Sequence, residues 1–365
     1  MKHQTTRYGE IPFYKIGTFG NTADAFISKK LFLEYKTKYS FPKKGDILIS
    51  ASGTIGRAVI YDGKPAYFQD SNTVWIDNDE TLVKNDFLFY AYSNVKWNTE
   101  HTTILRLYND NFRNTLIPLP PLNEQIAIAN VLSDLDRYLY SLRALILKKE
   151  GVKKALSFEL LSQRKRLKGF NQNWQRVRLG DICEFGNGGA YETLIVENGD
   201  FKLISLNSID IDGNLKNTMK RVNFYDNSLK QDDIVMVLSD VAHGDFLGLC
   251  AVIPSNDYVL NQRMGRLRIR NDCINILFLR LYINANQKYF KMQGQGSSQL
   301  NLSKKAIEDF EIPLPPLNEQ IAIANILSDL DHEITSLKNK KRQFESIKKA
   351  LNHDLMSAKI RVLKK

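Results

Sequence analysis

A stretch of fourteen residues, Ile-Pro-Leu-Pro-Pro-Leu-Asn-Glu-Gln-Ile-Ala-Ile-Ala-Asn, occurs twice in this chain. It covers residues 117–130 and, letter for letter, residues 312–325, so the copies lie 195 positions apart. The likeness continues beyond the identical stretch, because Leu132–Asp136 returns as Leu327–Asp331. An internal repeat of this length constrains the architecture before any other feature. The chain is therefore expected to consist of two units that end in the same element.

The repeated element is predicted to be a long helix. Its prolines cannot donate backbone hydrogen bonds and hold their neighbours extended, so the helix begins after them. Asn123 is the expected N-cap, and Glu124 suits the positive end of the helix dipole. With no proline after the hinge, the first helix is expected to run over residues 124–166, and the second to match it. The hinge prolines singled out are Pro120, Pro121, Pro315 and Pro316.

Apolar residues in both helices recur at alternating spacings of four and three, which is typical of a coiled-coil seam. Both copies then share the same irregularity in this spacing, so we expect the two helices to pack against each other, antiparallel, about a pseudo-twofold axis. Two unrelated amphipathic core helices are the alternative, but such helices seldom share so many residues. The seam residues are Leu132, Leu135, Leu139, Leu142, Leu327, Leu330, Ile334 and Leu337.

Composition limits the class of protein. The chain has 365 residues, enough for two to three domains. Its first ten residues are not expected to be a signal peptide, and the sequence has no apolar run of about 18 residues, the length that spans a bilayer. The three cysteines form no CxxC pair, which favours a reducing cytoplasm and argues against structural zinc or disulfides. The net charge is +11, but the helix segments 117–170 and 312–365 carry +5 and +4 of it, so charge alone supports DNA binding weakly.

The segments before the helices read as irregular mixed α/β domains. In residues 1–116, short strands are expected at 46–50, 58–61 and 73–76, with a short helix capped at 85–86. Residues 171–311 echo this order loosely, with strands at 234–238 and 264–269. We therefore expect an α+β fold with four parts, namely 1–116, 117–170, 171–311 and 312–365.

The two units differ in length. The second, 171–365, has 195 residues, whereas the first, 1–170, has 170. The difference corresponds to the stretch Trp174–Ile182 and its neighbours. The chain is therefore expected to start inside its first domain.

Together these features resemble the specificity (S) subunit of type I restriction-modification systems. The resemblance rests on the doubled proline hinge with its helix, on Trp174–Ile182, on Ser52–Gly56 and on Gly296–Ser303. It implies two target recognition domains that read a bipartite double-stranded DNA site, with the antiparallel helices as spacer. It also implies two DNA methyltransferase subunits and restriction/translocase subunits as partners. These partners would supply adenine methylation and ATP-dependent cleavage, so no catalytic residue, cofactor or metal is expected in this chain.

Candidate DNA contacts come from three patterns and from His243, which is expected in a loop and could touch DNA or nothing. The loop from Ser52 to Arg57 could approach a phosphate through exposed amides, or be a plain hairpin connection. Asparagine and glutamine amides before strands could read adenine, or cap turns. Arginines at alternate positions could clamp phosphates or bind guanine, or be a solvated strand face. The candidate DNA-binding residues are Ser52, Gly53, Thr54, Arg57, Asn72, His243, Asn261, Gln262, Arg263, Arg266 and Arg268.

Two other functions stay open at this point. Asp46, Asp62 and Lys64 loosely fit the spaced carboxylates and lysine of a metal-dependent endonuclease, although Asp62-Gly63 is better explained as a turn. A coiled-coil adaptor without DNA specificity would also have matched helices. The sequence favours a non-enzymatic DNA-recognition subunit over both.

Overall fold

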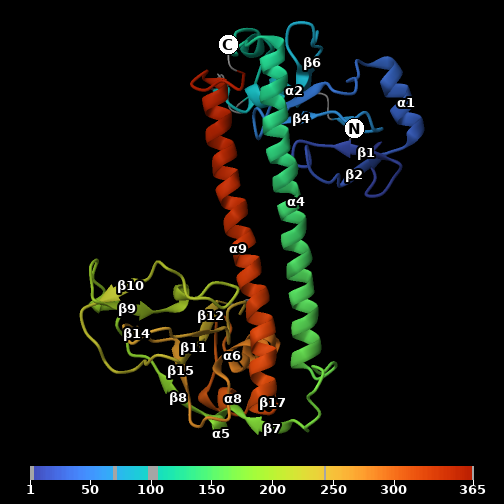
Figure 1. Cartoon of the computed structure of the whole chain (residues 1–365). Helices are drawn as coiled ribbons and strands as arrows, with labels where there is room; N and C mark the ends of the chain where they lie inside the picture. Colours follow the sequence, from blue (N-terminus) through green and yellow to red (C-terminus); the bar gives the residue numbers. More distant parts are fainter. Residues whose placement is uncertain (1–3, 69–71, 98–105, 242–243, 364–365) are drawn as a thin grey trace. The chain divides into compact units, whose positions relative to one another are not determined.

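The computed structural model describes residues 4–68, 72–97, 106–241 and 244–363. Its contacts divide the chain into two compact units. The first unit comprises Met1–Leu145 and Leu337–Lys365, and the second comprises Ile146–Ser336. Each unit contains one group of short sheets and a part of both long helices (Figure 1).

The first unit holds two three-stranded sheets. In one, β1 pairs antiparallel with β2 and parallel with β5; in the other, β3 lies between β4 and β6 and is antiparallel to both. The strands expected at 46–50, 58–61 and 73–76 are thereby confirmed. The bounds are β1 Ile11–Tyr14, β2 Ala25–Ile27, β3 Ile47–Ser50, β4 Ala58–Ile60, β5 Tyr67–Phe68 and β6 Thr73–Ile76.

Three short helices accompany these sheets: α1 (Lys29–Lys38), α2 (Asn85–Tyr92) and α3 (Asn109–Arg113). The α1 helix begins at Ser28, whose side-chain oxygen accepts a hydrogen bond from the amide of Leu31. The α2 helix is the one expected at 85–86, but Lys84 is its N-cap and provides no side-chain cap. Asn85 is the first helical residue instead, so its predicted capping role is wrong.

The second unit repeats these connections and adds to them. β9 pairs antiparallel with β10 and parallel with β14, as β1 does with β2 and β5. A four-stranded sheet has the order β13-β11-β15-β8, and β12–β16 and β7–β17 form two-stranded sheets. The bounds are β7 Gln175–Arg178, β8 Cys183–Asn187, β9 Phe201–Ile204, β10 Lys220–Val222, β11 Ile234–Val237, β12 Ser239–Val241, β13 Cys250–Val252, β14 Tyr258–Leu260, β15 Met264–Ile269, β16 Gln299–Asn301 and β17 Glu311–Leu314. The helices are α5 Leu179–Ile182, α6 Ile276–Ala285, α7 Gln287–Gln293 and α8 Lys304–Glu308, with 3-10 turns η2 Glu192–Leu194 and η3 Leu206–Ser208.

The two repeated segments form the predicted long helices, α4 (Leu122–Leu161) and α9 (Leu317–Met356), each 40 residues long. At 1.5 Å per residue each is about 60 Å long. Both begin directly after the hinge prolines, two residues earlier than expected. Asn123 is therefore not the N-cap: it lies in the first turn, where its side-chain oxygen accepts from the amide of Glu124 (2.9 Å).

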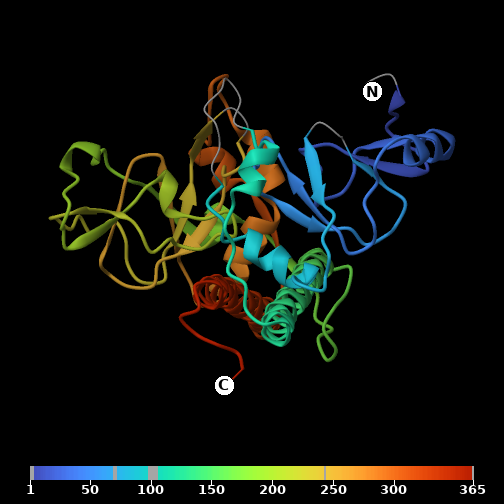
Figure 2. The same ribbon diagram turned by 90° about the horizontal axis from the view of Figure 1, so that it is seen from above.

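The helices run antiparallel in each unit. In the first unit Arg143 of α4 bonds to Glu345 of α9 (2.8 Å), and the rings of Tyr138 and Phe344 lie 4.8 Å apart. In the second unit Lys149 bonds to Glu333 (2.7 Å), and Lys153 pairs with Asp331. In the first unit Asp136 also pairs with Lys348. From Asp136–Lys348 to Arg143–Glu345, and in the second unit from Lys149–Glu333 to Lys153–Asp331, partner numbers on α9 fall as those on α4 rise, which is the mark of an antiparallel pair. Figure 2, seen along the helices, shows the α4 part of the first unit beside the end of α9.

The predicted seam is where this packing occurs. Leu132 and Leu327 are fully buried, and Leu132 packs with Phe87 of α2 and Leu355 of α9. The other seam residues are buried at Leu139, Leu142 and Ile334 and partly buried at Leu135, Leu330 and Leu337. The hinge prolines range from buried Pro315 through partly buried Pro120 and Pro316 to exposed Pro121. No helix of the described residues is both long and apolar enough to cross a membrane.

Candidate nucleic-acid interface

A buried glutamine ties the first hinge to its domain. Gln125, in the first turn of α4, is 1% exposed. Its amide nitrogen donates to the carbonyls of Pro120 (2.8 Å) and Leu82 (3.1 Å), and its oxygen accepts from the amide of Lys84 (2.8 Å). The segment that leads into α2 is thereby fixed to the start of the long helix.

The second hinge has the same arrangement. Gln320, 195 positions later, is fully buried. It donates to the carbonyls of Pro315 (2.8 Å) and Cys273 (2.9 Å) and accepts from the amide of Asn275 (2.8 Å). Both glutamines lie within the identical repeat, but no local pattern in the sequence predicts their role. Their identity in both copies was the available signal.

The loop expected to approach phosphate is built on glycines that neighbouring side chains require. Gly53 and Gly56 have φ values of +70° and +79°, a region that disfavours other residues. A Cβ at Gly53 would lie 2.8 Å from a methyl carbon of Ile16, and one at Gly56 would overlap the Trp97 ring. The loop geometry therefore has a packing reason that is independent of DNA.

Side chains in and beside this loop differ in exposure. Ser52 is buried, and its hydroxyl donates to the side-chain oxygen of Asn72 (2.7 Å). Thr54 and Arg57 are exposed, and the guanidinium of Arg57 donates to the carbonyl of Phe19 (3.1 Å). The structure thus brings five of the candidates together, Gly53 among them, with Gly53, Thr54 and Arg57 exposed.

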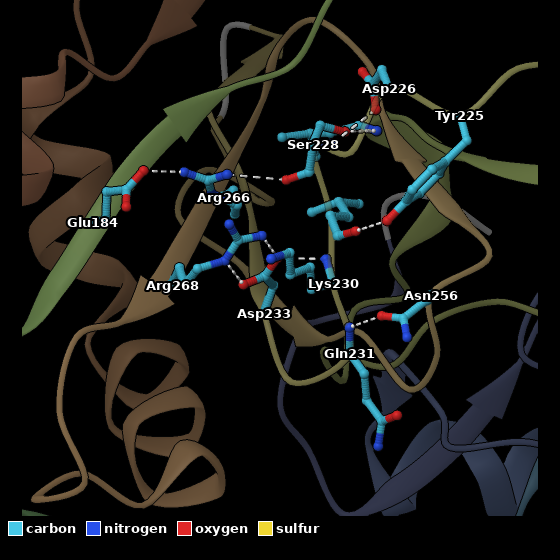
Figure 3. A network of polar contacts seen from close by, with 12 residues as sticks. Glu184, Tyr225, Asp226, Ser228, Lys230, Gln231, Asp233, Asn256, Arg266 and Arg268 are labelled. Carbon is cyan, nitrogen blue, oxygen red and sulfur yellow. Dashed lines mark hydrogen bonds and ion pairs between the residues drawn. The ribbon is translucent and has the colours of Figure 1, made fainter.

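Two arginines of the second unit, Arg266 and Arg268, are engaged by acids (Figure 3). Arg268 on β15 donates two hydrogen bonds, of 2.8 and 2.7 Å, to the buried carboxylate of Asp233. These bonds raise the pKa of Arg268 above its usual value. Arg266 donates to Glu184 and to the carbonyl of Ser228 (3.2 Å). As predicted, both project from the same face of β15, but their donors are largely used within the unit.

Two further candidates of the second unit, Asn261 and Gln262, bond to Glu192. Asn261, 1% exposed, donates to this carboxylate (2.9 Å) and accepts from the amide of Tyr191 (3.0 Å). Gln262 donates to the other carboxylate oxygen of Glu192 (2.6 Å). Arg263 is exposed and has a φ of +68°. His243 lies outside the described residues. All eleven DNA-contact assignments stay predictions, and of those described Gly53, Thr54, Arg57 and Arg263 are exposed.

The residues proposed for a nuclease have local partners. Asp46 is buried and accepts from the amide of Lys43 (2.7 Å). Asp62 accepts from the amide of Lys64 (2.9 Å), which lowers the pKa of its carboxyl. Within the described ranges, no three His, Cys, Asp or Glu residues are placed to hold a metal ion. These carboxylates act in turns, and nothing in their geometry favours the nuclease alternative.

The fold and its hinges define a class of internally repeated proteins. Two unlike α/β domains are each fixed to the start of one of two antiparallel helices by the same clamp, which is the buried glutamine Gln125 or Gln320 with its three hydrogen bonds. Residues 1–149 and 171–346 match the family described as Type I restriction modification DNA specificity domain. The chain belongs to this family, whose members are specificity subunits rather than catalytic ones. The predicted resemblance and fold class are confirmed.

Individual relatives agree. A putative type I restriction enzyme specificity subunit of Haemophilus influenzae is 61% identical over 137 residues, 37% of this chain and 36% of the relative. The chain thus spans about a third of that protein. The MjaVIII specificity subunit of Methanocaldococcus jannaschii is 28% identical over 93% of this chain and 84% of its own length. The crystal structure of an S subunit from M. genitalium has the same fold, with a TM-score of 0.65 at 20% identity, covering 98% of this chain and 91% of that one.

Proposed function

We propose that this chain reads a bipartite DNA site for a type I restriction-modification complex. The observation that carries the proposal is the duplicated clamp, in which Gln125 and Gln320 make equivalent bonds although the domains that they fix differ in sequence. Two domains that recognise different DNA sequences should differ in sequence themselves but be attached to the helices in the same way. Paired half-sites in DNA correspond to repeated units in the protein that binds them.

In this proposal, residues 1–116 and 171–311 are the two target recognition domains. Residues 117–170 and 312–365 are the hinges and spacer helices, whose length sets the number of unread base pairs. The exposed loop residues Thr54 and Arg57 are the contacts we favour in the first domain, and Arg263 in the second. Exposed cations can contact phosphates without first breaking an internal ion pair.

The long helices also bind partner proteins in this proposal. Monomeric proteins rarely leave large apolar side chains in groups on their surface. On α4, Tyr140 is 75% exposed, Leu147 69% and Phe158 55%. We assign these helix surfaces to two DNA methyltransferase subunits, with restriction/translocase subunits completing a cytoplasmic complex. Adenine methylation and ATP-dependent cleavage are then reactions of the partners.

Sequencing of genomic DNA for methylated adenine, in cells with and without this chain, tests the proposal. We expect one split motif to lose methylation when the chain is removed, with two half-sites at a constant spacing. Cells that carry the chain with the Arg57→Ala substitution should lose recognition in one half of that motif. Unchanged methylation after removal of the chain would overturn the proposal.

A further inference from the structure

A carboxylate on the surface of the second unit is held by two amides. Glu192 is exposed and begins the turn η2. Asn261 donates a hydrogen bond to one of its carboxylate oxygens (2.9 Å), and Gln262 donates to the other (2.6 Å). A carboxylate can accept about four hydrogen bonds in all. The two amides therefore fix the direction of the carboxylate and leave each oxygen able to accept from a further donor.

The backbone beneath this carboxylate is fixed as well. The amide of Gln262 donates to the carbonyl of Gly189 (2.6 Å), which joins the turn at Gln262 to the segment that leads to Glu192. A Cβ at Gly188 would lie 2.1 Å from the carbonyl oxygen of Asn261, so this close approach of two backbones requires glycine. The carboxylate is thus held by neighbours that are themselves held in place.

Unlike Glu184 and Asp233, which pair with arginines, Glu192 forms no ion pair within the part of the chain that the structure describes. Desolvation acts in the opposite direction, but the hydrogen bonds from Gln262 and Asn261 lower the pKa of Glu192, so this side chain is charged at neutral pH. Hydrogen bonds to a charged acceptor are stronger than those between neutral groups. A fixed carboxylate that no cation neutralises is therefore suited to a ligand that donates hydrogen bonds.

An exposed arginine stands beside this carboxylate. Arg263 follows Gln262 in the turn between β14 and β15, and its charge contributes to the lowered pKa of Glu192. Among the described residues, no acid forms an ion pair with Arg263. Its φ of +68° is a backbone conformation that glycine or asparagine adopts at lower cost, and residues held in such conformations concentrate at functional sites. The turn thus presents a hydrogen-bond acceptor and a guanidinium donor together.

We propose that Glu192 determines specificity in the second half-site by accepting a hydrogen bond from the N4 amino group of a cytosine. Carboxylates accept from this group in the major groove, and the O6 and N7 acceptors of the paired guanine suit the neighbouring Arg263. Adenine also carries an amino group, but its own N7 acceptor lies beside it and would repel a carboxylate. Asn261 and Gln262 are then positioning residues rather than readers of adenine. The inference rests on the proposed function, because only a chain that reads bases makes such a contact.

The methylated motif in cells tests this assignment. Genomic DNA is sequenced for methylated adenine in cells whose only copy of this chain is wild type or Glu192→Gln. In wild type, the half-site that Arg57→Ala leaves intact should contain a G·C pair whose replacement lowers methylation about tenfold. In Glu192→Gln that preference should fall to about twofold or less, because an amide can donate as well as accept. The other positions of the motif and its spacing should stay unchanged.

Glu197→Gln is the matched control. Glu197 is also exposed, and among the described residues it accepts no hydrogen bond, so this variant makes the same change in charge without altering the turn. It should keep the wild-type motif. In Glu192→Gln the partly buried amide of Gln262 can turn over and accept from the new side chain, so the melting temperature of the purified chain should stay within about 2 °C of wild type.

Several results would contradict the role of Glu192. A second half-site without a G·C pair, or the wild-type motif in Glu192→Gln, would overturn the proposal. Relaxation at an A·T pair would assign the carboxylate to adenine and overturn the choice of cytosine. Loss of several positions together with a lower melting temperature would give Glu192 a role in the fold instead, and the same relaxation in Glu197→Gln would reduce the effect to net charge.

Failure of this inference is distinct from failure of the proposed function. If removal of the whole chain leaves methylation unchanged, the proposed function fails. If the motif depends on the chain but Glu192→Gln does not alter it, only the role of Glu192 fails.

Discussion

Arg361 donates two hydrogen bonds to the carboxylate of Glu124, joining the segment after α9 to the first turn of α4. Arg166 and Glu319 form the same pair in the second unit, with bonds of 3.1 and 2.5 Å. The roles are exchanged: in each pair the arginine follows one long helix and the acid begins the other. An antiparallel pair of repeated helices produces this exchange, since the end of each helix meets the start of its partner.

Replacement of Glu124 by glutamine should show how much the Arg361–Glu124 pair adds to stability, because that contribution depends on pH. The hydrogen bond from Arg361 lowers the pKa of Glu124 from its ordinary value of 4.5. A carboxyl whose pKa is lowered by folding adds stability above its unfolded pKa and loses it as the pH falls through the folded pKa. Wild type should therefore have a higher urea midpoint than Glu124→Gln at pH 7, and the gap should close below about pH 4. An equal gap at both pH values would contradict the assignment.

The hinge clamp should be costly to remove. Gln125→Leu leaves two carbonyls and one amide, all part-buried, without their partner, which should lower the free energy of unfolding by about 3 kcal/mol. Gln125→Glu is the matched variant, because it keeps the acceptor for Lys84 but turns an oxygen toward two carbonyls. Its deficit should shrink on acidification, as protonation restores a donor. Urea unfolding at pH 7 and pH 4 measures the stability of both variants. A loss below about 0.5 kcal/mol for Gln125→Leu would contradict a stabilising role for the Gln125 hydrogen bonds.

Much of this architecture could be predicted because it depends on local pattern. The helices and the central strands follow from apolar spacing, which neighbours in sequence determine. The clamp does not, because Gln125 acts on Leu82 and Lys84, more than forty positions away. Asparagine favours the N-cap position, which predicts that role for Asn123. The helix instead starts directly at the hinge, and the carbonyl of Pro121 accepts hydrogen bonds from the amides of Glu124 and Gln125.

The arginine row shows the same limit. Alternation correctly placed Arg266 and Arg268 on one face of a strand. Their acids, Glu184 and Asp233, lie 82 and 35 positions away. No local pattern reveals whether an arginine faces DNA or an internal carboxylate, so the residues that contact bases could not be separated from those that hold the domain together.

Replacement of Arg268 should lower the stability of the fold, whether or not this residue contacts DNA. Its two bonds reach a buried carboxylate, so Arg268→Ala leaves Asp233 buried without its partner and should cost about 2 kcal/mol. Exposed Arg57 offers a contrast, since Arg57→Ala should cost under about 0.5 kcal/mol. Thermal unfolding measures both. If Arg268 also contacts DNA, affinity of the folded variant should fall by about 1–3 kcal/mol at one half-site; a loss under about 0.5 kcal/mol would leave it a structural role alone.

Two leucines of α4 separate helix packing from partner binding. Leu132 is fully buried between α2 and α9, so Leu132→Ala should lower the free energy of unfolding by about 3 kcal/mol through lost contacts and the cavity left behind. Leu147 is 69% exposed, and Leu147→Ala should change stability by under about 0.5 kcal/mol. If the exposed face of α4 binds a methyltransferase subunit, Leu147→Ala should nevertheless weaken that complex severalfold in a titration followed by calorimetry. Equal affinity for wild type and Leu147→Ala, with stability unchanged, would place the methyltransferase on another surface.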